Sequence, residues 1–450
     1  MRVSRRGRLA ERGLELLNGL VSELPAKRAR NPWTWIPTLY FTQGVPYALV
    51  ALLSSYLYKD FGVDDQRNTF YTSLLTLPWV LKPLWSPAVD IYRTRREWIW
   101  FLQLIMGAGL VLAAMAIGSG HFFAGTLAMF FVVAACSATH DIAADGFYIL
   151  ANSEGEQTFF SGVRSAFFKV SAIAWQGGLL VLVGWLTKAW GYKMSWQVGY
   201  CLAAAVLILT AVYHRFILPR PEKDKPARVE SARMYWEQFF ATFGAFFQKR
   251  QILVMLFFLL TYRLGEVQLT KISPLFLKTG VEKGGLGIAN EEMGLLNGLS
   301  LSAFLVGAAL GGFLVSRHGL KRWLWPMVII LHAPDLVYVY LSRAQPQNLG
   351  MIGSCLAVEQ FGYGFGFSAY MLYMLYMARG EHPTAHYAIC TGFMALGAML
   401  PGMASGSIEE KLGYANFFVW VLVAAIPGCV ATALIPLEKE FGRKRNSLTD

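Results

Sequence analysis

Charged residues are scarce in this chain of 450 residues, where Asp, Glu, Lys and Arg together make up 15%. A soluble domain usually carries about 25%. Apolar residues instead reach 55%, and the mean hydropathy is +0.42. One soluble core cannot hide so many apolar residues, and disordered chains are poor in them. The composition therefore excludes both classes and indicates a protein that crosses a membrane several times.

The sequence also lacks the short motifs that carry common enzyme chemistry. It has no nucleophile elbow, phosphate loop or HExxH motif, and His140-Asp141 has no placed serine to complete a triad. The five cysteines lie in apolar segments without metal-ligand spacing. No small-residue cleavage site follows a short apolar core, so a cleavable signal peptide is not expected. We therefore expect a protein that is not an enzyme, with no cofactor, disulfide framework or metal site.

Long apolar segments dominate what is present. Each is about 20 residues or longer, enough to cross a bilayer core of roughly 30 Å. Because lipid offers no partner for an open strand edge, such segments must be helices. The sequence predicts an all-α membrane protein with twelve transmembrane helices. They lie near residues 33–58, 68–89, 97–118, 122–149, 160–187, 196–218, 251–276, 292–316, 323–342, 349–378, 385–408 and 415–436.

The net charge of +12 is unusual for a chain that lives in lipid, and its distribution predicts the topology. If the N-terminus is cytoplasmic, 27 of the 40 Lys and Arg residues fall in cytoplasmic segments and 8 in the opposite loops. Such a bias predicts that both termini are cytoplasmic by the positive-inside rule. The basic composition thus reports orientation, and nucleic-acid binding is not expected.

The longest polar connection follows the sixth segment and divides the chain into two six-helix halves. Its second part, from Tyr235 to Gln248, is amphipathic and aromatic, which favours a helix on the membrane surface. We expect five parts: a basic N-terminal extension at 1–32, a first bundle at 33–218, a linker at 219–250, a second bundle at 251–438 and a tail at 439–450.

The two halves carry similar short loops after their second helices, which is typical of a parallel repeat. Each has a small residue followed by clustered basic residues, and the first also has an acid, Asp90. An acid in a tight turn can meet a basic residue of a neighbouring helix and close the cytoplasmic side in one state. We therefore predict a cytoplasmic gate, with membrane anchoring as the alternative. Its residues are Asp90, Arg93, Arg95, Arg96, Arg317 and Lys321.

Polar residues deep in the fourth segment are the first functional candidates, because charges in the hydrocarbon cost roughly 2.5–3.5 kcal/mol each. Asp141 and Asp145 are four residues apart and share one helix face. Two such carboxylates in a low dielectric cannot readily both ionise. We predict that they carry protons, with His140 as a further titrating group. The alternative is a static ion-pair cluster with Arg164 or Lys169 of the fifth segment.

The seventh and tenth segments supply candidate contacts for a solute. Arg263 and Glu266 are three residues apart and can pair along one face. In the tenth segment, Tyr363 and Tyr370 share a face with an acid, which suits a sugar-containing or cationic ligand. Packing and self-neutralisation are the alternatives. The predicted solute-binding residues are Arg263, Glu266, Glu359, Gln360, Tyr363, Tyr370 and Lys169.

Several stretches resemble the AmpG muropeptide permease branch of the major facilitator superfamily, which also includes acetyl-CoA transporters. They are Gly44-Val-Pro46, Leu84-Trp-Ser-Pro-Ala-Val-Asp90, Cys136-Ser-Ala-Thr-His-Asp141-Ile-Ala-Ala-Asp145 and Tyr262-Arg263-Leu-Gly-Glu266. The resemblance covers nearly the whole chain after Trp33. It implies proton-driven import of anhydromuropeptides across the bacterial inner membrane, and it implies that Asp141 and Asp145 matter for transport.

We therefore expect a proton-coupled transporter that works by alternating access, as a monomer in lipid. Its solute would be GlcNAc-anhydroMurNAc and its peptides, with a siderophore or acetyl-CoA as alternatives. A transporter-like receptor or assembly partner, docking through residues 1–30 and the central linker, is the alternative from another class.

Overall fold

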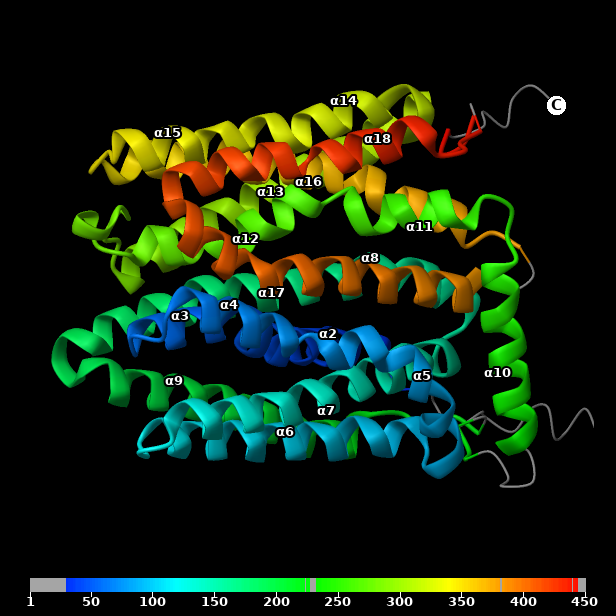
Figure 1. Cartoon of the computed structure of the whole chain (residues 1–450). Helices are drawn as coiled ribbons and strands as arrows, with labels where there is room; N and C mark the ends of the chain where they lie inside the picture. Colours follow the sequence, from blue (N-terminus) through cyan, green and yellow to red (C-terminus); the bar gives the residue numbers. More distant parts are fainter. Residues whose placement is uncertain (1–29, 223, 227–231, 381–382, 439, 444–450) are drawn as a thin grey trace, which may run out of the picture.

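The computed structural model describes residues 30–222, 224–226, 232–380, 383–438 and 440–443, in which all regular structure is helical. Most of the predicted extension at 1–32 and of the tail at 439–450 lies outside these residues. The helices lie lengthwise and form an elongated bundle, while α10 (Ala232–Phe247) runs across one end of it (Figure 1). We call this the α10 end and the opposite one the far end.

The part of the chain before α10 contributes one group of helices to the bundle. In order they are η1 (Pro32–Thr34), α2 (Ile36–Pro46), η2 (Tyr47–Leu53), α3 (Ser54–Asp60), α4 (Asp65–Leu74), α5 (Leu77–Tyr92), α6 (Arg95–Ile117), α7 (Phe122–Ala151), α8 (Glu154–Ile173), η3 (Ala174–Leu179) and α9 (Leu180–Ile217). Polar residues begin several of them. The hydroxyl of Thr94 caps α6 and that of Ser153 caps α8, each within a complete capping box.

The part after α10 contributes the second group of helices. These are α11 (Ile252–Thr261), α12 (Leu264–Lys278), η5 (Val281–Lys283), α13 (Asn290–His318), α14 (Leu320–His332), η6 (Ala333–Asp335), α15 (Leu336–Ala344), α16 (Leu349–Met377), α17 (Pro383–Ala424) and α18 (Ile426–Leu434). In Figure 1 the first group, blue to green, occupies the lower part of the view, and most of the second lies above it.

Eight stretches of the described chain are long and apolar enough to cross a membrane. Two of them, Gly155–Ile217 with 63 residues and Ala385–Leu434 with 50, far exceed the roughly 20 residues that one crossing needs. Each contains a glycine with positive φ, Gly191 at 70° and Gly413 at 69°, where the helix reverses at the far end (Figure 1). The all-helical membrane fold is confirmed, and the number of twelve crossings stays a prediction.

Apolar packing differs between the two ends of the bundle. At the far end, one core joins the two groups, with Leu57 and Trp196 from the first and Phe276 and Phe417 from the second. At the α10 end, each group has its own core, one around Phe147 and the other around residues of α11 and α16. The two groups are thus held together by apolar contacts at the far end.

Candidate functional site

A cavity of about 330 Å³ lies between the two groups of helices, within the range of small-molecule sites. Its charged lining residues in the described chain are all cations: Lys169, Arg263 and Lys271. No carboxylate side chain of the described residues lines it. Hydroxyl, phenol and amide groups complete the polar lining. They belong to Tyr47, Ser55, Tyr56, Ser73, Thr76, Gln176, Thr270, Ser273, Asn297, Ser300, Tyr338, Gln360 and Tyr363.

Two π-helical turns border this cavity. Tyr47 comes from η2, directly after Pro46, and Gln176 comes from η3, which contains two adjacent glycines. A π-turn is rare and often occurs at functional sites, because it changes the direction of the side chains that follow. Here the two turns direct polar side chains of the first group toward the second.

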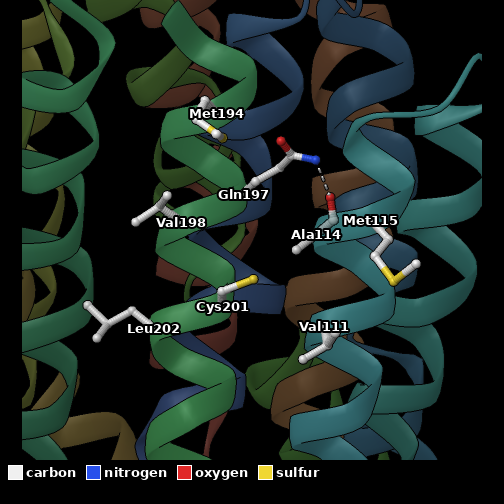
Figure 2. Close-up of a pocket in the computed structure, with 8 residues that line it drawn as sticks. All are labelled: Val111, Ala114, Met115, Met194, Gln197, Val198, Cys201 and Leu202. Atoms are coloured by element: carbon white, nitrogen blue, oxygen red, sulfur yellow. Dashed lines mark hydrogen bonds between the residues drawn. The ribbon is translucent and has the colours of Figure 1, made fainter. Parts of the chain in front are cut away.

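A second hollow, of about 570 Å³, lies between α6 and α9 (Figure 2). Figure 2 shows mostly aliphatic and sulfur-containing side chains around it, including Met115, Val198 and Leu202. The Gln197 amide nitrogen donates one hydrogen bond to the carbonyl of Ala114 at 3.0 Å. Met115 is 65% exposed, as expected of a surface that faces lipid. This hollow lacks the charges that an ionic solute requires.

Arg263 is the best-connected cation of the cavity. Its guanidinium lies 2.9 Å from the carboxylate of Glu266 and donates to the Tyr363 hydroxyl at 2.6 Å. It also lies 5.0 Å from the ring centre of Phe367. Glu266 is fully buried and accepts a second hydrogen bond from Thr270 at 2.6 Å. The structure therefore brings Arg263 and Glu266 together as their spacing predicts, and only Arg263 of the two reaches the cavity.

Lys169 and Lys271 reach the cavity without a carboxylate partner among the described residues. The Lys169 ammonium, from α8, lies 4.9 Å from the ring centre of Phe304 in α13. The Lys271 ammonium donates to the Thr72 hydroxyl at 3.5 Å. Each contact joins a residue of the first group to one of the second. Lys169 does not pair with the aspartates of α7, so that alternative from the sequence is wrong for this lysine.

The two aspartates of α7 share a face, as predicted, but have separate basic partners. Asp141 lies 3.9 Å from the ammonium of Lys82 in α5 and accepts from the Gln43 amide at 2.8 Å. Asp145 lies 2.6 Å from the Arg164 guanidinium. Its side chain is 45% exposed, against 13% for Asp141. The aspartates thus form two ion pairs that hold α7 against α5 and α8.

His140 does not join these carboxylates, contrary to the expectation from the sequence. Its ring is 1% exposed and accepts from the Gln103 amide at 3.0 Å. The amide oxygen of Gln103 lies 2.9 Å from Nδ1 of His214. The Nε2 of the same His214 ring lies 3.0 Å from the Thr38 hydroxyl. The chain of contacts links α6, α7 and α9 inside the first group. One residue along a helix turns the side chain by about 100°, which carries His140 away from Asp141.

The aromatic and acidic face predicted in α16 is only partly present. Tyr363 and Gln360 line the cavity. Glu359 is 2% exposed and does not, and Tyr370 is 1% exposed and donates to the carbonyl of Leu259 at 2.6 Å. Tyr370 also stacks on Tyr262 with ring centres 5.4 Å apart. Tyr370 is therefore a packing residue, because its hydroxyl already has a backbone partner.

The basic residues predicted to form a cytoplasmic gate lie at the α10 end. Arg95 and Arg96 donate their backbone N–H groups to the Asp224 carboxylate at 2.8 and 3.1 Å, and Arg93 lies 4.8 Å from the Phe101 ring. Asp90 belongs to α5, and its side chain lies outside the described part of the structure. Arg317 and Lys321, at the α13–α14 junction, are exposed. The ion pair of Arg379 with Glu438, also at this end, lies within the second group.

Ion pairs between the two groups occur at the far end instead. The Lys278 ammonium contacts the carboxylate of Asp60, which also accepts from Asn290 at 2.7 Å and from the Trp196 indole at 2.8 Å. We call these four residues the far-end cluster. Lys188 pairs with Glu291 across the same boundary. Sequence reasoning missed this cluster, because single charges at the ends of helices carry no pattern.

The sequence model of the Major Facilitator Superfamily matches residues 38–282. The chain belongs to this superfamily. The anhydromuropeptide permease of Escherichia coli is 27% identical over 421 residues, which are 90% of this chain and 80% of that protein. The resemblance to the AmpG branch is thereby confirmed, and this member of the superfamily is a bacterial multi-pass membrane transporter of small molecules.

Solved structures agree on the fold of this superfamily member. The nucleoside transporter NupG superposes with a TM-score of 0.66 at 16% identity, covering 90% of this chain and 98% of that one. A bacterial homolog of the human lysosomal transporter Spinster, in an inward-facing and unoccupied conformation, gives 0.64 at 15% identity over 91% and 96%. At such identities the likeness concerns the fold alone.

Proposed function

We propose that this transporter is a proton-coupled importer of anhydromuropeptides across the bacterial inner membrane. The observation that carries the proposal is the cavity between the two groups of helices, with three cations and no acidic side chain among its described lining residues. Anhydromuropeptides bear peptide carboxylates, which such cations bind, and sugar rings, which hydroxyl and amide groups bind. The similarity to an anhydromuropeptide permease supports the same solute.

The proposed topology has twelve crossings with both termini in the cytoplasm, arranged as bundles at 33–218 and 251–438. Reversals at Gly191 and Gly413 support the count, because each divides an overlong helix into two lengths that can span. The excess of Lys and Arg in the segments assigned to the α10 end supports a cytoplasmic α10 end. The transporter acts as a monomer, and its partners are lipid, the solute and protons, without nucleic acid.

In this orientation the far end is closed toward the periplasm, and the cavity empties at the α10 end. Alternating access requires the two bundles to rock around the central site. The residues predicted as a cytoplasmic gate, Arg93, Arg95, Arg96, Arg317 and Lys321 with Asp90, would then come together only when the α10 end closes. The shared apolar core and the ion pair of Lys278 with Asp60 at the far end support an inward-facing state.

Protons act on the carboxylates of α7 in this mechanism. Asp141 and Asp145 each have one basic partner, Lys82 and Arg164. Protonation removes the negative charge and releases the partner, which changes the relative stability of the two states. A ligand, here the proton, can shift that equilibrium only through its differential affinity for them.

Uptake of labelled anhydromuropeptide into proteoliposomes tests the proposal. We expect accumulation with an imposed inward proton gradient, and loss of accumulation in Asp141→Asn and Asp145→Asn. Exposed Asp64→Asn is the matched control, since Asp64 lies in a loop at the far end. Acetyl-CoA and a ferric siderophore, which are also anionic, serve as competitors. The solute assignment is wrong if either competitor is accumulated and the muropeptide is not.

A further inference from the structure

Three carboxylates of the second bundle lie buried near one another, behind the cavity wall. They are Glu266 of α12, Asp335 of η6 and Glu359 of α16, which are 0%, 1% and 2% exposed. Glu359 lies within Coulombic range of both others, and Asp335 within range of Glu266. A buried charge without a partner is strongly destabilising, because nothing compensates for its lost hydration. Three buried anions therefore need more than one positive charge.

Arg263 accounts for only one of the three. Its guanidinium pairs with Glu266 at 2.9 Å, and Glu266 has a further hydrogen bond from Thr270. Within the described part of the chain, Glu359 accepts only from the amide of its neighbour Gln360, at 3.1 and 3.3 Å. Neither oxygen of the Asp335 carboxylate has a hydrogen-bond partner among the described residues. Asp335 and Glu359 thus have no permanent cation of their own.

The two ring nitrogens of His332 have different surroundings. Its Nε2 lies 3.2 Å from the carbonyl oxygen of Tyr262, and since a carbonyl only accepts, Nε2 carries the hydrogen. In a neutral ring, Nδ1 is then an acceptor. This Nδ1 lies 3.6 Å from Asp335 Oδ2, and it too lacks a hydrogen-bond partner among the described residues. Two buried acceptors therefore face each other across 3.6 Å, just beyond hydrogen-bond distance, and a proton bound to either one would give the pair the donor that it lacks.

We propose that His332 and Asp335 share one bound proton, and that this pair is a proton-binding site in the second bundle, distinct from the aspartates of α7. The charged and titratable groups around it are Arg263 and Glu266 of the α12 end, Glu359 of α16 and Tyr338 of α15. Helix α17 also packs against η6, but its described residues give Asp335 no Coulombic partner.

Two residues of the cavity lining lie near the buried acids. Gln360 lines the cavity and donates to Glu359, and Tyr338 lines the cavity within Coulombic range of Glu359 and Asp335. Through Gln360, Glu359 lies one side chain behind the cavity wall. An anionic solute could draw Arg263 away from Glu266. The three buried carboxylates would then lose their nearby cation and bind a proton more tightly. Solute and proton then favour each other's binding, as linkage requires; this last step rests on the proposed function.

Infrared difference spectroscopy of the full-length protein in lipid tests the site without any solute. We expect a carbonyl band of a buried carboxylic acid that shifts in D₂O. Asp335→Asn should remove it, and Asp335→Glu should shift it. Asp64→Asn is the control and should leave it unchanged, since Asp64 is exposed at the far end. The proposal is overturned if no such band exists, if Asp335→Asn leaves it intact, or if Glu359→Gln alone abolishes it.

His332→Gln keeps the experiment decisive if both Asp335 variants fail to fold. A glutamine at position 332 cannot take the proton, so we expect the Asp335 carbonyl band to move to the frequency of an unpaired carboxylic acid. A band that does not move would show that Asp335 and His332 do not share a proton. Transport gives a separate readout. Asp335→Asn should reduce proton-driven accumulation about tenfold or more while solute exchange at equal pH continues. If the wild-type protein takes up no muropeptide, the proposed solute fails while the spectroscopic result stands.

Discussion

At the scale of single residues, the cavity cations differ in what balances them. Arg263 has Glu266 beside it, while Lys169 and Lys271 have an aromatic ring and a hydroxyl. An ammonium that contacts only such groups retains most of its capacity to bind an anion, because neither neutralises its charge. The two lysines are therefore the residues on which the affinity for a carboxylate depends most directly.

Replacing either lysine by alanine should weaken solute binding. A hydrogen bond to a charged group contributes about 1.5–3 kcal/mol, so the KM for anhydromuropeptide uptake should rise roughly tenfold or more in Lys169→Ala and in Lys271→Ala. Lys411→Ala, which removes an exposed lysine at the far end, is the matched control. A KM unchanged in both cavity variants would contradict the role of the basic lining.

Residue-scale prediction from the sequence succeeded where neighbours on one helix decide the contact. Arg263 and Glu266 are one turn apart, and their pairing follows from helix geometry. It failed for His140, Tyr370 and Glu359, since which side of a helix faces the cavity depends on the helices around it. The same reason applies to Lys271, which only the structure identifies as a cavity residue.

At the scale of elements, a polar chain inside the first bundle joins α6, α7 and α9 through Gln103, His140 and His214. All three side chains are buried, at 0%, 1% and 0% exposure. Their hydrogen bonds satisfy one another, which fixes the relative rotation of the three helices. Helix packing of this kind is a structural role, and it separates His140 from proton transfer.

His140→Leu should therefore lower stability and spare coupling. The change leaves a Gln103 amide hydrogen unsatisfied, which costs about 1–3 kcal/mol, and the melting temperature in detergent should fall. The ratio of uptake with and without a proton gradient should match the wild-type ratio. Asp141→Asn, one residue away, is the comparison variant, and in it we expect the proton gradient no longer to increase uptake. An equal loss of this uptake ratio in both variants would show that His140 takes part in proton coupling.

Close contacts of glycines determine how the elements meet at the far end. Gly294 of α13 lies against Gly177 of η3, and a Cβ at Gly294 would be 2.6 Å from the Gly177 carbonyl oxygen. Gly184 of α9 similarly lies against the backbone of Glu291. Larger residues at these positions would force the bundles apart, because the obstructing atoms belong to the backbone.

Gly294→Val should shift the protein toward the state that is open at the far end. Overpacking costs about 1–3 kcal/mol, which changes the equilibrium between the two states by about 5- to 150-fold. Labelling of Asn297→Cys in the cavity by a membrane-impermeant thiol reagent, added from outside, should accelerate. Gly312→Val is the control on the same helix, since a Cβ there meets nothing within 4 Å. The same acceleration in both variants would exclude this explanation.

At the scale of the whole molecule, contacts between the bundles are concentrated at the far end. One apolar core joins them there, and the far-end cluster adds a buried ion pair, with Lys278 8% and Asp60 2% exposed. At the α10 end each bundle has its own core, α10 runs across that end (Figure 1), and α5 of the first bundle packs against α17 of the second. This asymmetry defines which side of the transporter is closed.

Asp60→Asn should open the far end, because it leaves the Lys278 ammonium buried without a counter-charge. Spin labels on the exposed residues Asp64 and Lys283, one on each bundle, should report longer distances by pulsed electron resonance. Adding Lys278→Met to Asp60→Asn should restore much of the closed population, since no unpaired charge remains. Unchanged distance distributions in Asp60→Asn would mean that the apolar core alone closes this end.

The sequence by itself determined the class of fold, since apolar segments of this length can only be helices in lipid. It also determined the family branch, through motifs such as the stretch from Cys136 to Asp145, and local pairs within one helix. Only the tertiary structure decided the partners of Asp141 and Asp145, the basic cavity and the far-end cluster. It also decided the pairing of His332 with Asp335 beside Glu359. The physical reason is that hydrophobic periodicity reports burial along a single helix, while the meeting of charges from different helices depends on their rotation and packing in the bundle.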